Sequence, residues 1–280
     1  MAQPTAPGQA GLGLSGPGIF WVNSRVKDPA EFPFDDFLRW YDDVHIPDIL
    51  RVKPDGEDGG GGGGDGIRAS WRYRCTDPNR ASPVLVVHKC PDLAFLQTAA
   101  FRSIPMTHAS LPGNKPIHQL AALDTRFVQH VETWSSPVAN DGRAPMLVSE
   151  AIDPAADVTP DAFDAWFRSV HVPEVAALPG WRRTSRFALA FKKPNPDTDD
   201  AAHPTPRFLA LHEFAEGPAA ATDTAVVPAS GIITTFPPQP AAATRAILDA
   251  ARTVDVAAFR YVCGFGDVDT RWVDTAEKRV

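Results

Sequence analysis

The hydrophobic positions between residues 34 and 49 follow the period of one helix face. The residues at spacings i, i+3, i+4, i+7 and i+8 are Phe37, Trp40, Tyr41, Val44 and His45. Because Pro47 biases the residue before it away from the α region, we expect this helix to end near His45. A histidine in the last turn lies near exposed carbonyls and the negative end of the helix dipole, which favours its protonated form. The pattern predicts an aromatic-faced helix that ends in a titratable group.

The same pattern occurs a second time, at residues 160–175. A Trp, a His and a Pro keep one register in both segments, together with several apolar positions. The identical residues Asp35, Phe37, Trp40, Val44, His45 and Pro47 match Asp161, Phe163, Trp166, Val170, His171 and Pro173. We interpret this match as an internal duplication.

Apolar and alternating runs predict strands in the same order in both halves. They lie at 19–22, 67–74, 83–90 and 126–134, and again at 146–149, 181–188, 207–214 and 259–263. Further helices are expected at 92–104 and 241–251. Each half therefore has the order β-α-β-β-α-β, which is typical of a ferredoxin-like antiparallel sheet with two helices on one face. Two copies in one chain can cover each other's free sheet faces. We predict an α+β fold in which two tandem ferredoxin-like repeats form an intramolecular barrel.

The predicted organisation has three parts. Residues 1–17, rich in Gly, Pro and Ala, form an expected disordered tail, and residues 18–137 and 144–280 form the two repeats. The first repeat contains a polyglycine segment at 55–66 that the second lacks. Acidic residues flank this segment and would repel phosphate, so we expect a flexible loop rather than a phosphate cradle.

Composition excludes several classes of protein. The net charge is −7, and no dense Lys/Arg run is present, so a nucleic-acid partner is not expected. No apolar run approaches the roughly 18 residues that a membrane span needs. The three cysteines are an odd number without close pairing, which indicates reduced thiols and a cytoplasmic location.

The duplicated helix-end histidines are the first candidates for chemistry. Tyr41, Asp42, Asp43 and Asp48 surround His45, and a carboxylate could orient its imidazole for work near neutral pH. The corresponding positions around His171 are Phe167, Arg168, Ser169 and Glu174. We therefore expect chemistry at His45 and a mainly structural role for His171. The alternative for both is a helix cap held by packing.

Strand residues offer a second pair of histidines, His88 and His212. If their face of the sheet is the barrel interior, each enters an apolar cavity, where burial would lower its pKa and keep it a neutral base. Otherwise each is a strand-end histidine in solvent or bonded to backbone. On a neighbouring strand Arg72 could stabilise a carboxylate or enolate, although such arginines are often solvated. No His/Cys pair shows zinc spacing, so we expect no metal and no cofactor, with a haem ligand left open.

The segment WYDDVHIPD after a first strand, with the duplicated pattern, resembles the dimeric α/β-barrel superfamily. The closest branch is the EthD-like group in a tandem-duplicated fungal form, to which the tracts PDLAFLQTAAFRSIP and LPGNKPIHQLAALDTRFVQ are also similar. The resemblance covers about residues 18–137 and 144–265. It implies a barrel superfamily that includes cofactor-free polyketide cyclases and decarboxylases, quinol-forming monooxygenases and haem-dependent peroxidases.

These observations give one leading hypothesis and two alternatives. The leading one is a cofactor-independent acid–base enzyme, a lyase of decarboxylase, dehydratase or cyclase type, acting on a small aromatic or polyketide-like substrate in fungal secondary metabolism. Its expected catalytic residues are His45, Asp43, Tyr41 and His88, and its expected substrate-binding residues are Trp40, Trp71, Arg72, His171 and His212. The chain would be a monomer with an internal pseudo-dimer, or a homodimer. The alternatives are a non-catalytic small-molecule-binding or stress-related barrel, favoured by a filled barrel interior, and a quinol-type monooxygenase.

Overall fold

The structure is a computed structural model that describes residues 14–53, 66–137, 144–194, 205–215 and 230–280. Residues 1–13 of the expected tail and nearly all of the polyglycine segment lie outside these ranges. Residues 14–17 do not behave as a free tail. The side chain of Leu14 is buried, and the backbone N–H of Gly16 donates to Asp92 Oδ1 at 2.9 Å.

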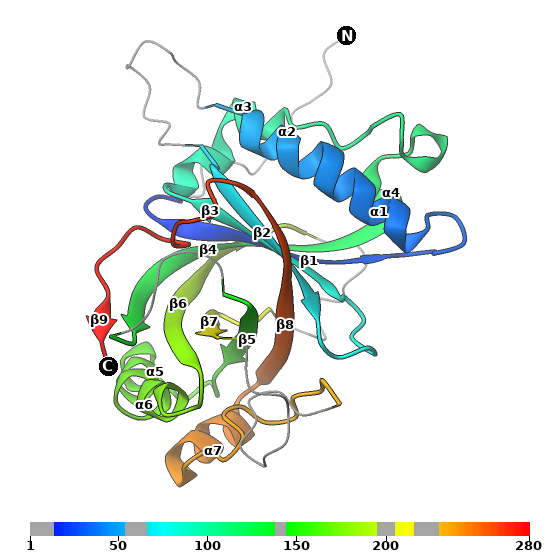
Figure 1. Cartoon of the computed structure of the whole chain (residues 1–280). Coiled ribbons are helices and arrows are strands. Elements are labelled where there is room, and N and C mark those ends of the chain that lie inside the picture. Colours follow the sequence, from blue (N-terminus) through cyan, green and yellow to red (C-terminus); the bar gives the residue numbers. More distant parts are fainter. Residues whose placement is uncertain (1–13, 54–65, 138–143, 195–204, 216–229) are drawn as a thin grey trace, which may run out of the picture.

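Eight antiparallel strands form a closed barrel (Figure 1). The order around the barrel is β1-β3-β2-β8-β5-β7-β6-β4, and β4 pairs again with β1. The strands are β1 (Gly18–Val26), β2 (Ala69–Cys75), β3 (Val84–Cys90), β4 (Ala121–Ser135), β5 (Met146–Asp153), β6 (Trp181–Lys192), β7 (Phe208–Phe214) and β8 (Thr253–Gly266). A short strand, β9 (Lys278–Arg279), pairs parallel to β4. The predicted α+β barrel is confirmed.

The two halves arrange their strands alike. Those of the first half lie in the order β4-β1-β3-β2, and those of the second in the order β8-β5-β7-β6. The halves join through the antiparallel pairs β2–β8 and β4–β6. Closure leaves neither half-sheet with an open edge, which removes the usual route to edge-to-edge association.

The helix that was expected to end near His45 continues past it, so that prediction is wrong. α1 (Phe34–Trp40) passes through a π-helical turn (Tyr41–His45) into α2 (Ile46–Arg51). The N–H of Ile46 donates to the carbonyl of Tyr41, five residues back. This wider turn allows Pro47, which has no N–H, to lie inside the helix. The second half repeats the arrangement in α5 (Pro160–Trp166), a π turn (Phe167–His171) and α6 (Val172–Ala176).

The remaining helices are short. The predicted helix at 92–104 is interrupted at Thr98, whose backbone is extended and whose side chain caps the next turn. It consists of a 3₁₀ turn (Leu93–Gln97) and α3 (Ala99–Arg102), followed by a 3₁₀ turn (Pro112–Asn114) and α4 (Ile117–Leu120). In the second half α7 (Ala242–Ala250) matches the prediction closely. No helix in the part of the chain described here is long and apolar enough to cross a membrane.

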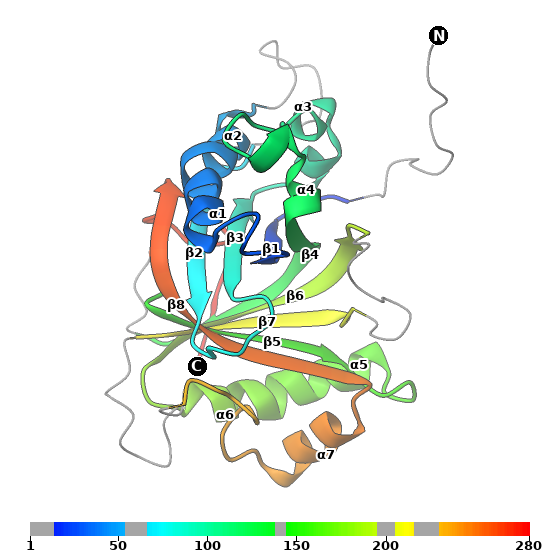
Figure 2. The ribbon, with the colours of Figure 1, turned by 90° about the vertical axis from the view of Figure 1, so that its right-hand side faces the viewer.

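The helices lie outside the barrel on two opposite sides (Figure 2). α1–α4 cover the first half, and α5–α7 cover the second. Alternate strand residues point inward and form one apolar cluster, which includes Trp21, Trp71, Tyr73 and Phe259 and is completed by Trp272 from the C-terminal segment. The other strand residues pack beneath the helices. The inward-facing residues therefore form a core of their own, separate from the clusters beneath the helices.

Candidate functional site

Two buried histidine pairs lie on opposite sides of the barrel, one in each half. In both, the first histidine ends the π turn and the second lies on the third strand of that half. The strand histidines share the sheet face that packs against the helices, because they alternate with the residues of the interior cluster. The possibility that His88 and His212 enter the barrel interior is therefore wrong, although both are fully buried.

The first pair is His45 and His88. The ring of His45, 8% exposed, stacks on Trp40 with 4.8 Å between centroids, and the ring of His88 stacks on Phe20 at 4.7 Å. Burial lowers the pKa of His45 to about 4, more than the nearby carboxylate of Asp48 raises it. Burial also lowers the pKa of His88 to about 3, and the neighbouring His45 adds to this effect. Both imidazoles are neutral at pH 7, contrary to the protonated helix-end histidine expected for His45.

The first pair has unsatisfied hydrogen-bonding capacity. His88 Nδ1 lies 2.7 Å from Ser70 Oγ. Within the described residues, His88 Nε2, His45 Nδ1 and Trp40 Nε1 are buried and have no hydrogen-bond partner. Unpaired buried polar atoms are rare because each costs about 1–3 kcal/mol, so such atoms mark places where water or a ligand binds.

The structure separates the other predicted residues of the first half. Tyr41 is buried near His45, with 5.8 Å between ring centroids, and burial raises the pKa of its phenol well above the usual value, so it stays protonated. Asp43 is exposed and makes no hydrogen bond to His45, so the structure does not support it as the orienting group. Asp42 accepts from Arg72 Nε at 2.7 Å and from its Nη2 at 2.6 Å, which occupies the guanidinium expected to bind substrate.

Trp71 also lies away from the histidines. It points into the barrel, where its Nε1 donates to the carbonyl of Val268 at 3.3 Å. Neighbouring strand residues point to opposite faces, so Trp71 and Arg72 do not share one side of β2. Of the predicted residues of the first half, the structure brings together Trp40, Tyr41, His45 and His88.

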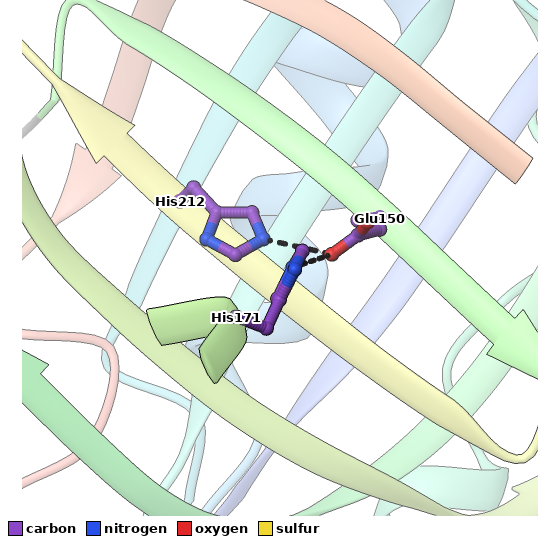
Figure 3. Close-up of side chains that lie close together, drawn as sticks. All are labelled: Glu150, His171 and His212. Carbon is purple, nitrogen blue, oxygen red and sulfur yellow. Dashed lines mark hydrogen bonds and ion pairs between the residues drawn. The ribbon is translucent and has the colours of Figure 1, made fainter. Parts of the chain in front are cut away.

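The second pair, His171 and His212, shares a carboxylate that sequence reasoning missed. Glu150 on β5 places its Oε2 atom 2.7 Å from His171 Nε2 and 3.2 Å from His212 Nε2 (Figure 3). Burial alone would raise the pKa of Glu150, but its interactions with the two histidines outweigh this and lower it to about 2. Burial lowers the pKa of His212. A buried carboxylate is thus ionised at neutral pH beside two imidazoles.

Packing fixes the second pair from two sides. His212 Nδ1 lies 2.9 Å from Thr184 Oγ1, which also accepts a hydrogen bond from Trp181 Nε1 at 2.9 Å. Phe236 packs against both imidazoles, with centroid distances of 6.4 Å to His171 and 4.9 Å to His212. His171 is therefore not an isolated helix cap.

Strand register identifies the first-half counterpart of Glu150. Val148 lies opposite His212 and Glu150 two residues on, whereas Phe20 lies opposite His88 and Val22 two residues on. A valine in the first half thus replaces the carboxylate of the second. The available signal was a charged residue within the apolar run MLVSEAID, since a charged side chain is rarely buried without a partner. The strand predicted at 146–149 ends one residue before Glu150.

Glu150, His171 and His212 are also the residues that could hold a metal ion. Each offers one ligand atom, and these atoms lie within 4.8 Å of one another. The predicted asymmetry placed the useful carboxylate beside His45 on the helix. The structure instead places a carboxylate beside His171, and a strand supplies it.

Comparisons with known proteins show the fold. No family model matches the chain, and no curated protein matches it. An anthrone oxidase-like protein of known structure has a TM-score of 0.53 at 10% identity, over 89% of this chain and 93% of that one. Proposed monooxygenases from Fusobacterium nucleatum and Lactobacillus acidophilus give TM-scores of 0.46 and 0.43 at 11% and 8% identity, each over 90% of this chain and 96% of the other. The chain has the fold of the dimeric α/β barrels.

Proposed function

We propose that this chain is a small-molecule enzyme in which the His45–His88 pair removes a proton from a small aromatic, polyketide-like substrate. The observation that carries the proposal is the group of three buried polar atoms without partners, Trp40 Nε1, His45 Nδ1 and His88 Nε2. A substrate hydroxyl or carbonyl would satisfy them. Burial makes the two imidazoles weak bases but keeps them neutral, with a lone pair available to accept a proton, and the Trp40 N–H and the protonated Tyr41 phenol can offset the weak basicity by donating to developing negative charge.

The reaction we favour is that of a quinol-type monooxygenase. Removal of a carbon-bound proton from an electron-rich aromatic substrate leaves an anion that can react with dioxygen. For an anthrone, the net change is one CH₂ group plus O₂ giving one carbonyl plus water, which balances without a further reductant. The similar structure described as anthrone oxidase-like makes this compound class the first to test. Decarboxylation, dehydration and cyclisation begin with the same kind of proton transfer and remain lyase-type outcomes of the assay.

We further propose that the halves descend from one ferredoxin-like unit of the EthD-like group, in the tandem form found in fungi. The equal strand order, the duplicated π turn and the two histidine pairs support this origin. A barrel that closes within one chain supports a monomer with an internal pseudo-dimer. We place the protein in the cytoplasm, since its cysteines are free thiols.

A second candidate is a binding protein without turnover, in which the same unpartnered atoms of Trp40, His45 and His88 hold a ligand that is not converted. The test incubates the protein with a hydroxylated anthrone and with a hydroquinone. Oxygen uptake, quinone absorbance and product mass are recorded, so that loss of CO₂ or water is also detected. We expect turnover that falls at least 100-fold in His45→Gln and His88→Gln and is unchanged in the control His118→Gln, whose side chain is exposed.

Two results would contradict the proposal. Full activity in folded His45→Gln and His88→Gln proteins would remove the pair from the chemistry. Saturable binding of these compounds, measured by quenching of tryptophan fluorescence, with no product from any of them would favour the binding protein.

A further inference from the structure

The second histidine pair has the composition and spacing of a metal site. Glu150 is 1% exposed, and His171 and His212 are fully buried. Figure 3 shows that each of the two imidazoles directs a ring nitrogen toward the same carboxylate oxygen. The three side chains come from three different elements of the chain, β5, the second π turn and β7. This cluster lies on the opposite side of the barrel from His45 and His88, so it is independent of the proposed active site.

The distances suit a first-row divalent ion. Metal–nitrogen and metal–carboxylate bonds of about 2.0–2.2 Å place neighbouring ligand atoms about 3.0–3.5 Å apart in tetrahedral or octahedral geometry. The Oε2 atom of Glu150 lies 2.7 and 3.2 Å from the two Nε2 atoms, and the three ligand atoms lie within 4.8 Å of one another, so the side chains would adjust their separations when they bind an ion. Glu150 Oε1 is buried and has no partner in the described part of the chain, which leaves a second carboxylate oxygen free for the ion.

The surroundings prepare His212 to act as a ligand. A histidine that binds metal through Nε2 carries its proton on Nδ1 and usually donates it to a fixed oxygen. Thr184 Oγ1 lies 2.9 Å from His212 Nδ1, and its second lone pair accepts from Trp181 Nε1. The threonine can therefore hold the tautomer that exposes the Nε2 lone pair. Phe236 packs over both rings and keeps the ligands close together.

We propose that Glu150, His171 and His212 bind one divalent transition-metal ion of the iron-to-zinc series. Two imidazoles and one carboxylate favour these ions over Mg²⁺ and Ca²⁺, which prefer oxygen ligands. The ion would join the second π turn to β5 and β7 and neutralise a buried carboxylate. The competing arrangement is a metal-free network in which each imidazole donates an Nε2–H to Glu150.

The test uses the full chain, stripped with a chelator and titrated with Co²⁺ as a spectroscopic probe and with Zn²⁺ by calorimetry. We expect one ion per chain, visible d–d absorption with Co²⁺ and a rise in melting temperature with Zn²⁺. Glu150→Gln and His212→Gln should weaken binding at least 100-fold. The matched control is His88→Gln in the first half, where Val22 occupies the position of the carboxylate and no ion is expected. This variant should still bind one ion per chain.

A mapping experiment on the wild type covers the case in which the ligand variants do not fold. Fe²⁺ with ascorbate oxidises residues that hold the ion, and mass spectrometry should find 2-oxohistidine at His171 or His212 but not at His45. The titrations reach 100 μM Co²⁺ or Zn²⁺, which is about a hundredfold excess over a micromolar Kd. If less than about 0.1 ion per chain binds at that concentration, the metal-free network is established. Unchanged binding in folded Glu150→Gln, or oxidation confined to other histidines, would place any ion elsewhere.

Discussion

Acidification from pH 7.5 to 5.0 is expected to destabilise this protein through His45 and His88. Their folded pKa values of about 4 and about 3 lie below the value of about 6.5 for an unfolded histidine. Between pH 6.5 and these folded values the unfolded chain binds more protons than the native one. The free energy of unfolding therefore falls as pH falls, by about 1.4 kcal/mol per pH unit for each histidine.

The magnitude follows from the width of that window. From pH 6.5 to 5.0 each imidazole contributes about 2 kcal/mol, and the pair about 4 kcal/mol, which is a large part of a typical stability of about 5–15 kcal/mol. His212 and His130, whose pKa values burial also lowers, act in the same direction and add to this loss. Glu150 acts at lower pH, because its folded pKa of about 2 removes stability only below about 4.5.

Urea denaturation followed by tryptophan fluorescence at pH 7.5, 6.5, 5.75 and 5.0 measures the effect. His88→Gln should reduce the pH-dependent loss by about 2 kcal/mol, whatever its effect at pH 7.5, because one of the buried neutral imidazoles is gone. The exposed His118→Gln should keep the wild-type pH dependence. A wild-type loss below about 1 kcal/mol, or equal pH dependence in His88→Gln and wild type, would refute the assignment of neutral buried histidines.

Two further predictions concern stability at pH 7.5, each measured by urea denaturation. Asp42→Asn should lower the free energy of unfolding by about 2–3 kcal/mol, because it leaves the guanidinium of Arg72, which is 6% exposed, without its carboxylate. The control is Asp36→Asn in the exposed pair with Arg39, which should lower it by less than about 0.5 kcal/mol. Equal effects would show that the Asp42 pair is not desolvated. Gly266→Ala should lower the free energy of unfolding more than Gly113→Ala does. Both glycines have a positive φ, but a Cβ at 266 would lie 2.1 Å from a backbone carbonyl oxygen, whereas the atom nearest to a Cβ at 113 is 3.8 Å away. A smaller loss for Gly266→Ala would mean that this backbone can relax.

The barrel could be predicted because its signals are local and occur twice. The helix period at 34–49 and the alternation in each strand fix the element types, and the duplicated order restricts the topology. The end of the helix could not be predicted in the same way. A proline usually ends a helix, and whether a π turn accommodates it depends on backbone packing against the sheet, which the sequence does not display.

The candidate site was predicted only in part, for a related reason. Both histidine pairs follow from the duplication, but the group that distinguishes them comes from the first strand of each half. When the two halves are aligned by sequence, the helices match at one residue offset and the first strands at a different one. Val22 and Glu150 are therefore recognised as corresponding positions only through the pairing of their strands with β3 and β7. Asp43 is close to His45 in sequence, yet it lies on the solvent side of the helix.

One side chain therefore separates the chemistry of the two halves. A buried carboxylate that is ionised at neutral pH needs a compensating positive charge, because an unpaired buried charge costs several kcal/mol. Beside Glu150 the ring nitrogens of His171 and His212 lie 2.7 and 3.2 Å from the carboxylate, and the metal ion proposed above would supply that charge. Val22 brings no charge to His45 and His88, and burial lowers the pKa of both imidazoles and keeps them neutral at pH 7. The same folded frame therefore places a carboxylate beside the histidine pair of one half and an apolar side chain beside the pair of the other.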